Sequence, residues 1–365
     1  MTACATSKAY SDETVNPERL LTLFGVHELR SLAFIGLSKN AGKTTTLNHL
    51  LRALKATDFP RDVALSSIGR DGEDEDVVSG GVKPKIYVRE GSWIATAESC
   101  LANCDAVLDL QLSTDINTAF GRVYIARALT DGYVEIAGPS IASELKLLEQ
   151  LIRERAADAL FLVDGALSRR SPAGGGLTEA AILAVACQDS SRPERLLARC
   201  RHALNVLRLS LPDEATLGSF LEARERFPLA RAIRLGQDGK AEPLETESLL
   251  GQQELLREFV REDTRSLLLL GAVTDPILAA LRAIPLRHPL QLLLEDGSRL
   301  FVSEKEALRC QQQRLSFAAL SEIKIPCLCI NPQMQDGSPV DAKPLLELLR
   351  RELDLPVLNL GPALD

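Results

Sequence analysis

The residues best suited to chemistry form a short glycine-rich segment near the N-terminus, Gly36-Leu37-Ser38-Lys39-Asn40-Ala41-Gly42-Lys43-Thr44. An apolar run, Ser31 to Ile35, precedes it, and leucines at helical spacing follow it, which predicts a strand, a loop and a helix. The backbone N–H groups of such a loop, with the positive end of the helix dipole, can hold phosphate. Gly42 would permit close approach, Lys43 would reach the β- and γ-phosphates, and the Thr44 hydroxyl would bind Mg²⁺.

The spacing of the glycines departs from the common G-x4-G-K-[ST] pattern. The first glycine is Gly36 and not residue 37, which gives G-x5-G-K-T. This spacing resembles that of dethiobiotin synthetase and its relatives among the MinD- and ParA-like ATPases. Many relatives place a lysine five residues before the loop lysine; Ser38 occupies that position here, and Lys39 follows it, so a homodimer sharing a lysine is left open. The predicted nucleotide-binding residues are Ser38, Lys39, Asn40, Ala41, Gly42, Lys43, Thr44 and Thr45.

A magnesium nucleotide also needs a carboxylate, which is usually found at the end of a neighbouring strand. Asp164 ends the apolar run Ala159 to Val163 and resembles the glutamate of the V-E-G-A-G stretch in dethiobiotin synthetase. Glu135 is a second candidate. Its alternative interpretation is a solvent-facing charge within a strand.

An acidic stretch, residues 70–76, follows the second predicted strand. Related ATPases keep at this place a residue that polarises the attacking group or binds magnesium. Asp71 is the first candidate for this catalytic and metal-binding role, and Glu73 is the second. A solvated acidic loop is the alternative.

Composition narrows the class of protein. The net charge is −8 and no Lys/Arg-rich run is present, which argues against binding to nucleic acid or acidic membranes. No apolar stretch reaches the roughly 18–20 residues of a membrane helix, and no signal peptide is recognised, so a cytoplasmic location is expected. The eight cysteines lie mostly in apolar segments, as is typical of reduced, buried thiols. The guanine-reading N-K-x-D pattern is absent, which favours ATP over GTP.

Strands alternate with helices in both halves of the chain, which predicts an α/β fold with parallel sheets. We expect an N-terminal extension over residues 1–30, a P-loop NTPase domain over 31–200 and a second, smaller α/β domain over 201–365, with the boundary between 190 and 262. The same patterns predict a helix over 178–187 and hairpins over 85–97 and 290–302. Asn331-Pro332 follows a predicted strand and is interpreted as a turn, with contact to a nucleotide base as the alternative.

Several stretches resemble one family, the reactivase component of lysine 5,6-aminomutase. They are residues 37–48, 67–76, 114–118, 131–140 and 163–169, and the resemblance covers roughly residues 31–187. It implies an ATP-driven, chaperone-like protein that helps to replace damaged cobalamin on an adenosylcobalamin-dependent aminomutase, together with a second reactivase component. Residues 114–118 and 131–140 would then be candidates for partner contact or switching, with turns between strands as the alternative.

Two other functions remain open from the sequence. One is a dethiobiotin-synthetase-like ligase that phosphorylates a small carboxylate or carbamate. The other is a nucleotide-dependent switch that dimerises without turnover. ATP and Mg²⁺ are the expected cofactors in each case.

Overall fold

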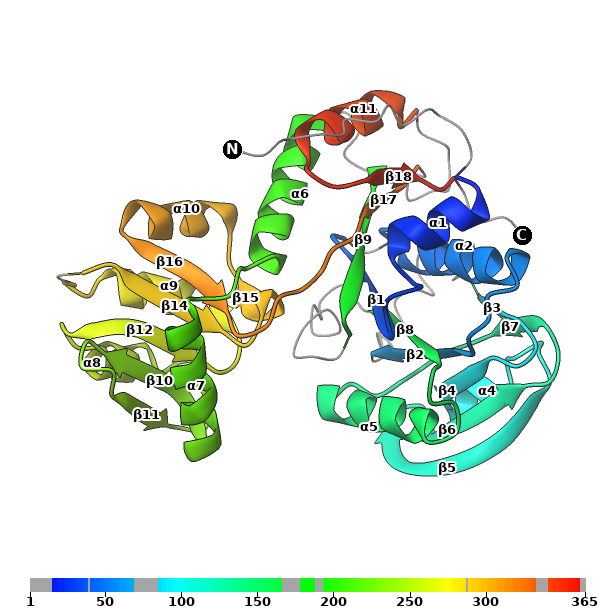
Figure 1. Ribbon diagram of the computed structural model, residues 1–365, viewed down its shortest axis with the longest axis horizontal. Coiled ribbons are helices and arrows are strands. Elements are labelled where there is room, and N and C mark those ends of the chain that lie inside the picture. Colours follow the sequence, from blue (N-terminus) through cyan, green and yellow to red (C-terminus); the bar gives the residue numbers. More distant parts are fainter. Residues whose placement is uncertain are drawn as a thin grey trace.

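The computed structural model describes residues 15–38, 40–68, 85–165, 178–187, 193–286, 288–332 and 341–361. Within these residues the strands form one nine-stranded sheet, one five-stranded sheet and two short two-stranded sheets. The two large sheets occupy separate lobes, with helix α6 (Pro193–Leu207) running between them (Figure 1). The predicted α/β class is confirmed.

The nine-stranded sheet contains the glycine-rich segment. Its strands, in spatial order, are β18 (Val357–Asn359), β17 (Leu328–Asn331), β9 (Ala180–Ala186), β1 (Ser31–Gly36), β8 (Leu160–Gly165), β2 (Val63–Ile68), β4 (Trp93–Ala97), β6 (Gly121–Ala128) and β5 (Leu108–Thr118). Neighbouring strands run parallel from β18 to β4, and β6 and β5 extend the sheet in antiparallel pairing. The carboxyl ends of β1, β8, β9 and β17 therefore meet at one edge.

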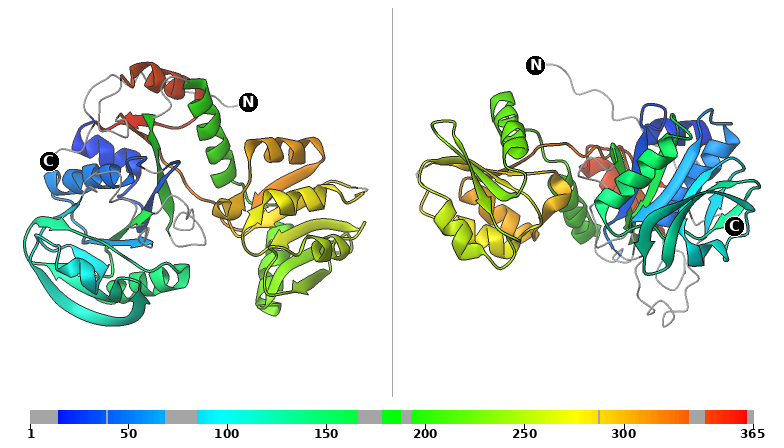
Figure 2. Two further views of the ribbon diagram at one scale, coloured as in Figure 1. Left: turned by 180° about the vertical axis from the view of Figure 1, so that it is seen from behind. Right: turned by 90° about the horizontal axis from the view of Figure 1, so that it is seen from below.

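Helices cover both faces of this sheet, which explains why its central strands are buried along almost their whole length. Strands β2 and β9 are buried at every residue. Helices α1 (Pro17–Phe24) and α2 (Lys43–Ala56) pack on one face, and α5 (Ala142–Arg153), α6 and α11 (Lys343–Glu352) pack on the other (Figure 2).

The five-stranded sheet forms the second lobe. Its order is β11 (Ala241–Glu245), β10 (Ala230–Gly236), β12 (Thr264–Leu269), β14 (Leu290–Leu294) and β16 (Leu315–Ala319). Strands β12, β14 and β16 run parallel, whereas β10 pairs antiparallel with β11 and β12. Both large sheets are therefore mixed, and the prediction of parallel sheets is corrected for their antiparallel edges. Helix α7 (Glu214–Arg226) packs on one face, and α8 (Gln253–Phe259), α9 (Asp275–Arg282) and α10 (Glu304–Gln312) pack on the other.

The short elements complete the described chain. They are α4 (Glu98–Leu101), the 3-10 helix η3 (Gly297–Arg299), the antiparallel pair β3 (Ile86–Val88) with β7 (Gly132–Val134), and the parallel pair β13 (Val273–Thr274) with β15 (Leu300–Phe301).

The chain returns to the first sheet after completing the second. Strands β17 and β18 lie within the range 201–365 assigned to a second domain, yet β17 pairs with β9 and β18 pairs with β17. The assignment of this last segment is therefore corrected. The second sheet is an insertion between α6 and β17. The sequence alone does not show that β17 returns to the first sheet, because its pairing partner β9 lies far back in the chain.

Three predicted elements are wrong. Residues 178–187 were expected to form a helix but include strand β9. A run of buried apolar residues has no polar face to reveal its period, so helix and strand look alike in sequence. The expected hairpins over 85–97 and 290–302 are also absent, because β3 pairs with β7 and β15 pairs with β13.

The described cysteines are free thiols, and all but Cys104 are buried. Burial raises the pKa of Cys187 to about 11 and that of Cys200 to about 12, so both thiols stay protonated at neutral pH.

Among the described helices, none has the length and apolar character needed to cross a membrane.

Candidate functional site

The glycine-rich loop, residues 36–44, joins the carboxyl end of β1 to the start of α2. Gly42 is the residue before α2 and has a φ of 90°, a conformation that favours glycine. No side chain caps the first turn of α2. The first N–H groups of a helix point towards its N-terminal end, which is the end that favours an anion.

Gly36 has a steric role that explains the unusual glycine spacing. A Cβ at this position would lie 2.8 Å from the Cβ of Ala41 and 3.3 Å from the Cγ of Lys43. The loop thus folds back over the strand end, and the Lys43 stem runs beside Gly36. The next residue, Leu37, is held by its N–H, which donates to the Ala184 carbonyl at 3.0 Å.

Thr44 and Asp164 lie together beneath the loop. The Thr44 hydroxyl donates to Asp164 Oδ2 at 3.1 Å. Strand pairing produces this contact, because β1 and β8 are parallel neighbours with Phe34 opposite Asp164. A hydroxyl oxygen and a carboxylate oxygen at this separation are ligands of the kind that Mg²⁺ prefers.

Glu135, the alternative carboxylate, has a different neighbour. It follows β7 directly, and its Oε2 accepts a hydrogen bond from Asn103 Nδ2 at 2.6 Å. Asp164, and not Glu135, is therefore the carboxylate for which the structure gives a contact with Thr44.

The other predicted site residues divide into two groups. Ser38, Asn40 and Ala41 lie in the loop, and Thr45 lies in the first turn of α2. Lys39, Asp71 and Glu73 lie outside the described residues.

Asn331, for which the sequence offers a turn or a base contact, lies against the glycine-rich loop. It ends β17, and its Nδ2 donates to the Asn40 carbonyl at 3.2 Å. A Cβ added to Gly42 would lie 2.7 Å from the Cβ of Asn331. The available signal was its position at a strand end, but the neighbouring strand could not be known from sequence.

Two further segments reach this edge of the sheet. Arg199 of α6 donates from Nη2 to the Leu37 carbonyl at 3.4 Å. Gly138 lies against β2: its N–H donates to Ser67 Oγ at 2.8 Å, and an added Cβ would lie 1.9 Å from the Ser67 carbonyl oxygen. Because Ser67 is opposite Asp164 in the sheet, part of segment 131–140 lies close to the strand that carries the carboxylate.

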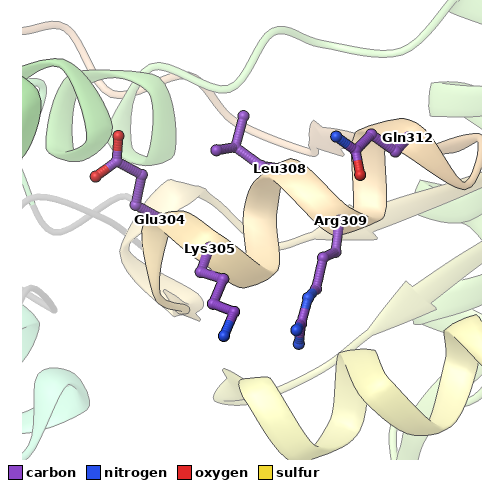
Figure 3. A pocket seen from close by; sticks show the side chains of 5 residues that line it. All are labelled: Glu304, Lys305, Leu308, Arg309 and Gln312. Atoms are coloured by element: carbon purple, nitrogen blue, oxygen red, sulfur yellow. The ribbon is translucent and has the colours of Figure 1, made fainter.

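A surface hollow of about 440 Å³ lies elsewhere, on the second lobe. Its lining comes from one helix, α10, with Glu304, Lys305, Leu308, Arg309 and Gln312 (Figure 3). The Lys305 and Arg309 side chains extend to one side of α10, and those of Glu304 and Leu308 to the other (Figure 3). Within the described residues, no group of three or more His, Cys, Asp and Glu side chains is placed to hold a metal ion.

No family model matches the chain, and no curated protein matches it. Its function must be inferred from the site itself.

Proposed function

We propose that this chain is a Mg²⁺-dependent P-loop ATPase. The observation that carries the proposal is the contact between Thr44 and Asp164 at the start of α2. It provides two oxygen ligands for a hard cation at the point where helix N–H groups favour phosphate.

Each residue has a defined role in the proposed mechanism. The N–H groups of the loop and of the first turn of α2 would bind the phosphates, and the Lys43 ammonium would bind between the β- and γ-phosphates. Thr44 and Asp164 would hold the ion. When bound, Mg²⁺ would neutralise the charge that develops on the phosphate oxygens. Asp71 remains the proposed residue for orienting the attacking group.

We infer further that the ATPase acts on a protein, an adenosylcobalamin-dependent aminomutase, and promotes exchange of its damaged cobalamin with a second reactivase component. Support comes from the resemblance over residues 31–187 and from the inserted second lobe, which contacts α6. The His202 ring of α6 has Nε2 2.8 Å from the Val302 carbonyl oxygen. ATP can shift such a complex between an open and a closed state only if the two states bind ATP with different affinities.

A reconstituted assay tests this function. ATP hydrolysis by the purified chain should be slow alone and should rise several-fold when the mutase carries inactive cobalamin. Lys43→Ala should abolish both rates. Hydrolysis that ignores the mutase would contradict the partner assignment.

The same assay separates the alternatives. Turnover that requires a small carboxylate or carbamate and no protein would favour a ligase. Nucleotide-dependent dimerisation without any turnover would favour a switch.

A further inference from the structure

Asn331 touches the glycine-rich loop from a segment 291 residues away in sequence. It makes two contacts at this edge of the sheet: a hydrogen bond to the Asn40 carbonyl, and a close approach of its Cβ to Gly42. Both contacts are with the main chain of the loop, so Asn331 can act on the loop's shape.

The two loop residues that Asn331 touches both have left-handed backbone. Asn40 has a φ of 56° and Gly42 has a φ of 90°. Left-handed residues within a turn direct successive N–H groups into one concavity that binds anions. A left-handed residue other than glycine is uncommon and needs support from its surroundings. Asn331 gives this support by donating a hydrogen bond to the Asn40 carbonyl and by packing against the loop at Gly42.

The orientation of the Asn331 amide follows from its surroundings. Its Oδ1 is buried and has no hydrogen-bond partner among the described residues. Turning the amide over would place Oδ1 against the Asn40 carbonyl oxygen, which offers no proton. The donor must therefore face the loop.

We propose that Asn331 is a positioning residue that holds the loop in its phosphate-binding shape before nucleotide arrives. This inference rests on the proposed nucleotide binding and assigns Asn331 to the phosphates, not to the base. A residue that reads the base would affect only ligands that have one. A residue that shapes the loop affects every polyphosphate equally.

Calorimetric titration with MgATP, MgGTP and magnesium triphosphate distinguishes these roles. For Asn331→Ala we expect the affinities for ATP and inorganic triphosphate to fall by the same factor, about tenfold, because the hydrogen bond to Asn40 and part of the packing at Gly42 are lost. The ratio of ATP to GTP affinity should stay unchanged. Asn359→Ala is the matched control, because Asn359 ends the adjacent strand β18 opposite Ile330 and should leave all affinities unchanged.

Two results would overturn the inference. A loss of ATP affinity with triphosphate binding intact would assign Asn331 to the base. Unchanged affinities for both ligands would mean that Asn331 only fills space beside the loop. If Asn331→Ala lowers the melting temperature, Asn331→Leu replaces it, because Leu keeps the branched shape without a donor or an added charge; a parallel loss is again expected. If the wild-type chain binds neither ligand, the proposed function itself fails.

Discussion

Thr44 and Asp164 are 120 residues apart in sequence and are brought together by two parallel strands. Lys43 and Thr44 could be predicted because the motif is continuous in the chain. Asp164 could be predicted because carboxyl ends of parallel strands share an edge. The sequence favoured Asp164 over Glu135 only by the position of each in its predicted strand, since it does not show which strand lies beside β1. For the same reason it could not show that Asn331, left open between a turn and a base contact, lies against the glycine-rich loop.

Removing the Asp164 charge should weaken the binding of ATP only when magnesium is present. For Asp164→Asn we expect the ATP affinity measured with Mg²⁺ to fall about tenfold to a hundredfold, while the affinity in EDTA stays close to wild type. Glu135→Gln is the matched control and should change neither value. Equal losses from the two variants would contradict the assignment of Asp164.

The C-terminal end of α2 contacts a separate cluster of polar and charged side chains. Lys55 Nζ forms an ion pair with Asp131, and Tyr87 donates its hydroxyl to the same Asp131 oxygen at 2.9 Å. These hydrogen bonds, that from Lys55 foremost, lower the pKa of Asp131 from 3.8 to about 2. Because both charges of the pair are well exposed, solvent screening limits its contribution to stability.

This depressed pKa gives a pH prediction. A folded chain that binds the Asp131 proton more weakly than the unfolded chain gains stability above pH 4 and loses it as the pH falls towards 2. The free energy of unfolding of the wild type should therefore decrease more steeply between pH 4 and pH 2 than that of Asp131→Asn. Urea denaturation at a series of pH values measures both slopes, and parallel curves would refute the prediction.

At the scale of elements, the joint between α6 and the second lobe depends on close packing of backbone. Gly297 of η3 lies against the end of α6: an added Cβ would be 2.2 Å from the Val206 carbonyl oxygen and 2.5 Å from that of Leu207. Local sequence signals can predict that η3 is a turn but not what it packs against. The buried strand β9 was misread for a related reason, because burial on both faces depends on helices elsewhere in the chain.

Gly297→Ala should therefore destabilise the protein. The clashing atoms are backbone atoms that cannot move cheaply, so we expect a loss of about 1–3 kcal/mol in the free energy of unfolding. Gly218→Ala is the control, because Gly218 lies inside α7 with no atom within 4 Å of an added Cβ. This control should gain about 0.5–1 kcal/mol. Urea denaturation of the two variants would contradict the account if both were stabilised.

At the scale of the whole molecule, the second lobe is inserted at a point where its two ends meet. The Ala319 N–H donates to the Ser210 carbonyl at 3.0 Å, and Arg208 Nη2 donates to the Ile325 carbonyl at 2.8 Å. Insertions are tolerated where chain ends lie close together. Sequence composition predicted two α/β units, but only the strand order shows that one interrupts the other.

The nine-stranded sheet should fold without the inserted lobe. A chain in which a short Gly/Ser linker replaces residues 211–318 should remain soluble, keep its α/β circular dichroism spectrum and bind ATP within about threefold of wild type. Its pairings from β18 to β5 all lie outside the deleted segment. An unfolded product would show that the first sheet depends on the second lobe.

In the proposed function, the glycine-rich loop binds a polyphosphate through main-chain N–H groups and the Lys43 ammonium. Calorimetric titration of MgATP into wild type and Lys43→Ala tests it most directly, with Lys146→Ala on the exposed side of α5 as the control. Wild type and the control should bind equally, and Lys43→Ala should bind about a hundredfold more weakly, as expected for a lost charged hydrogen bond. Equal affinity of Lys43→Ala and wild type would contradict the claim.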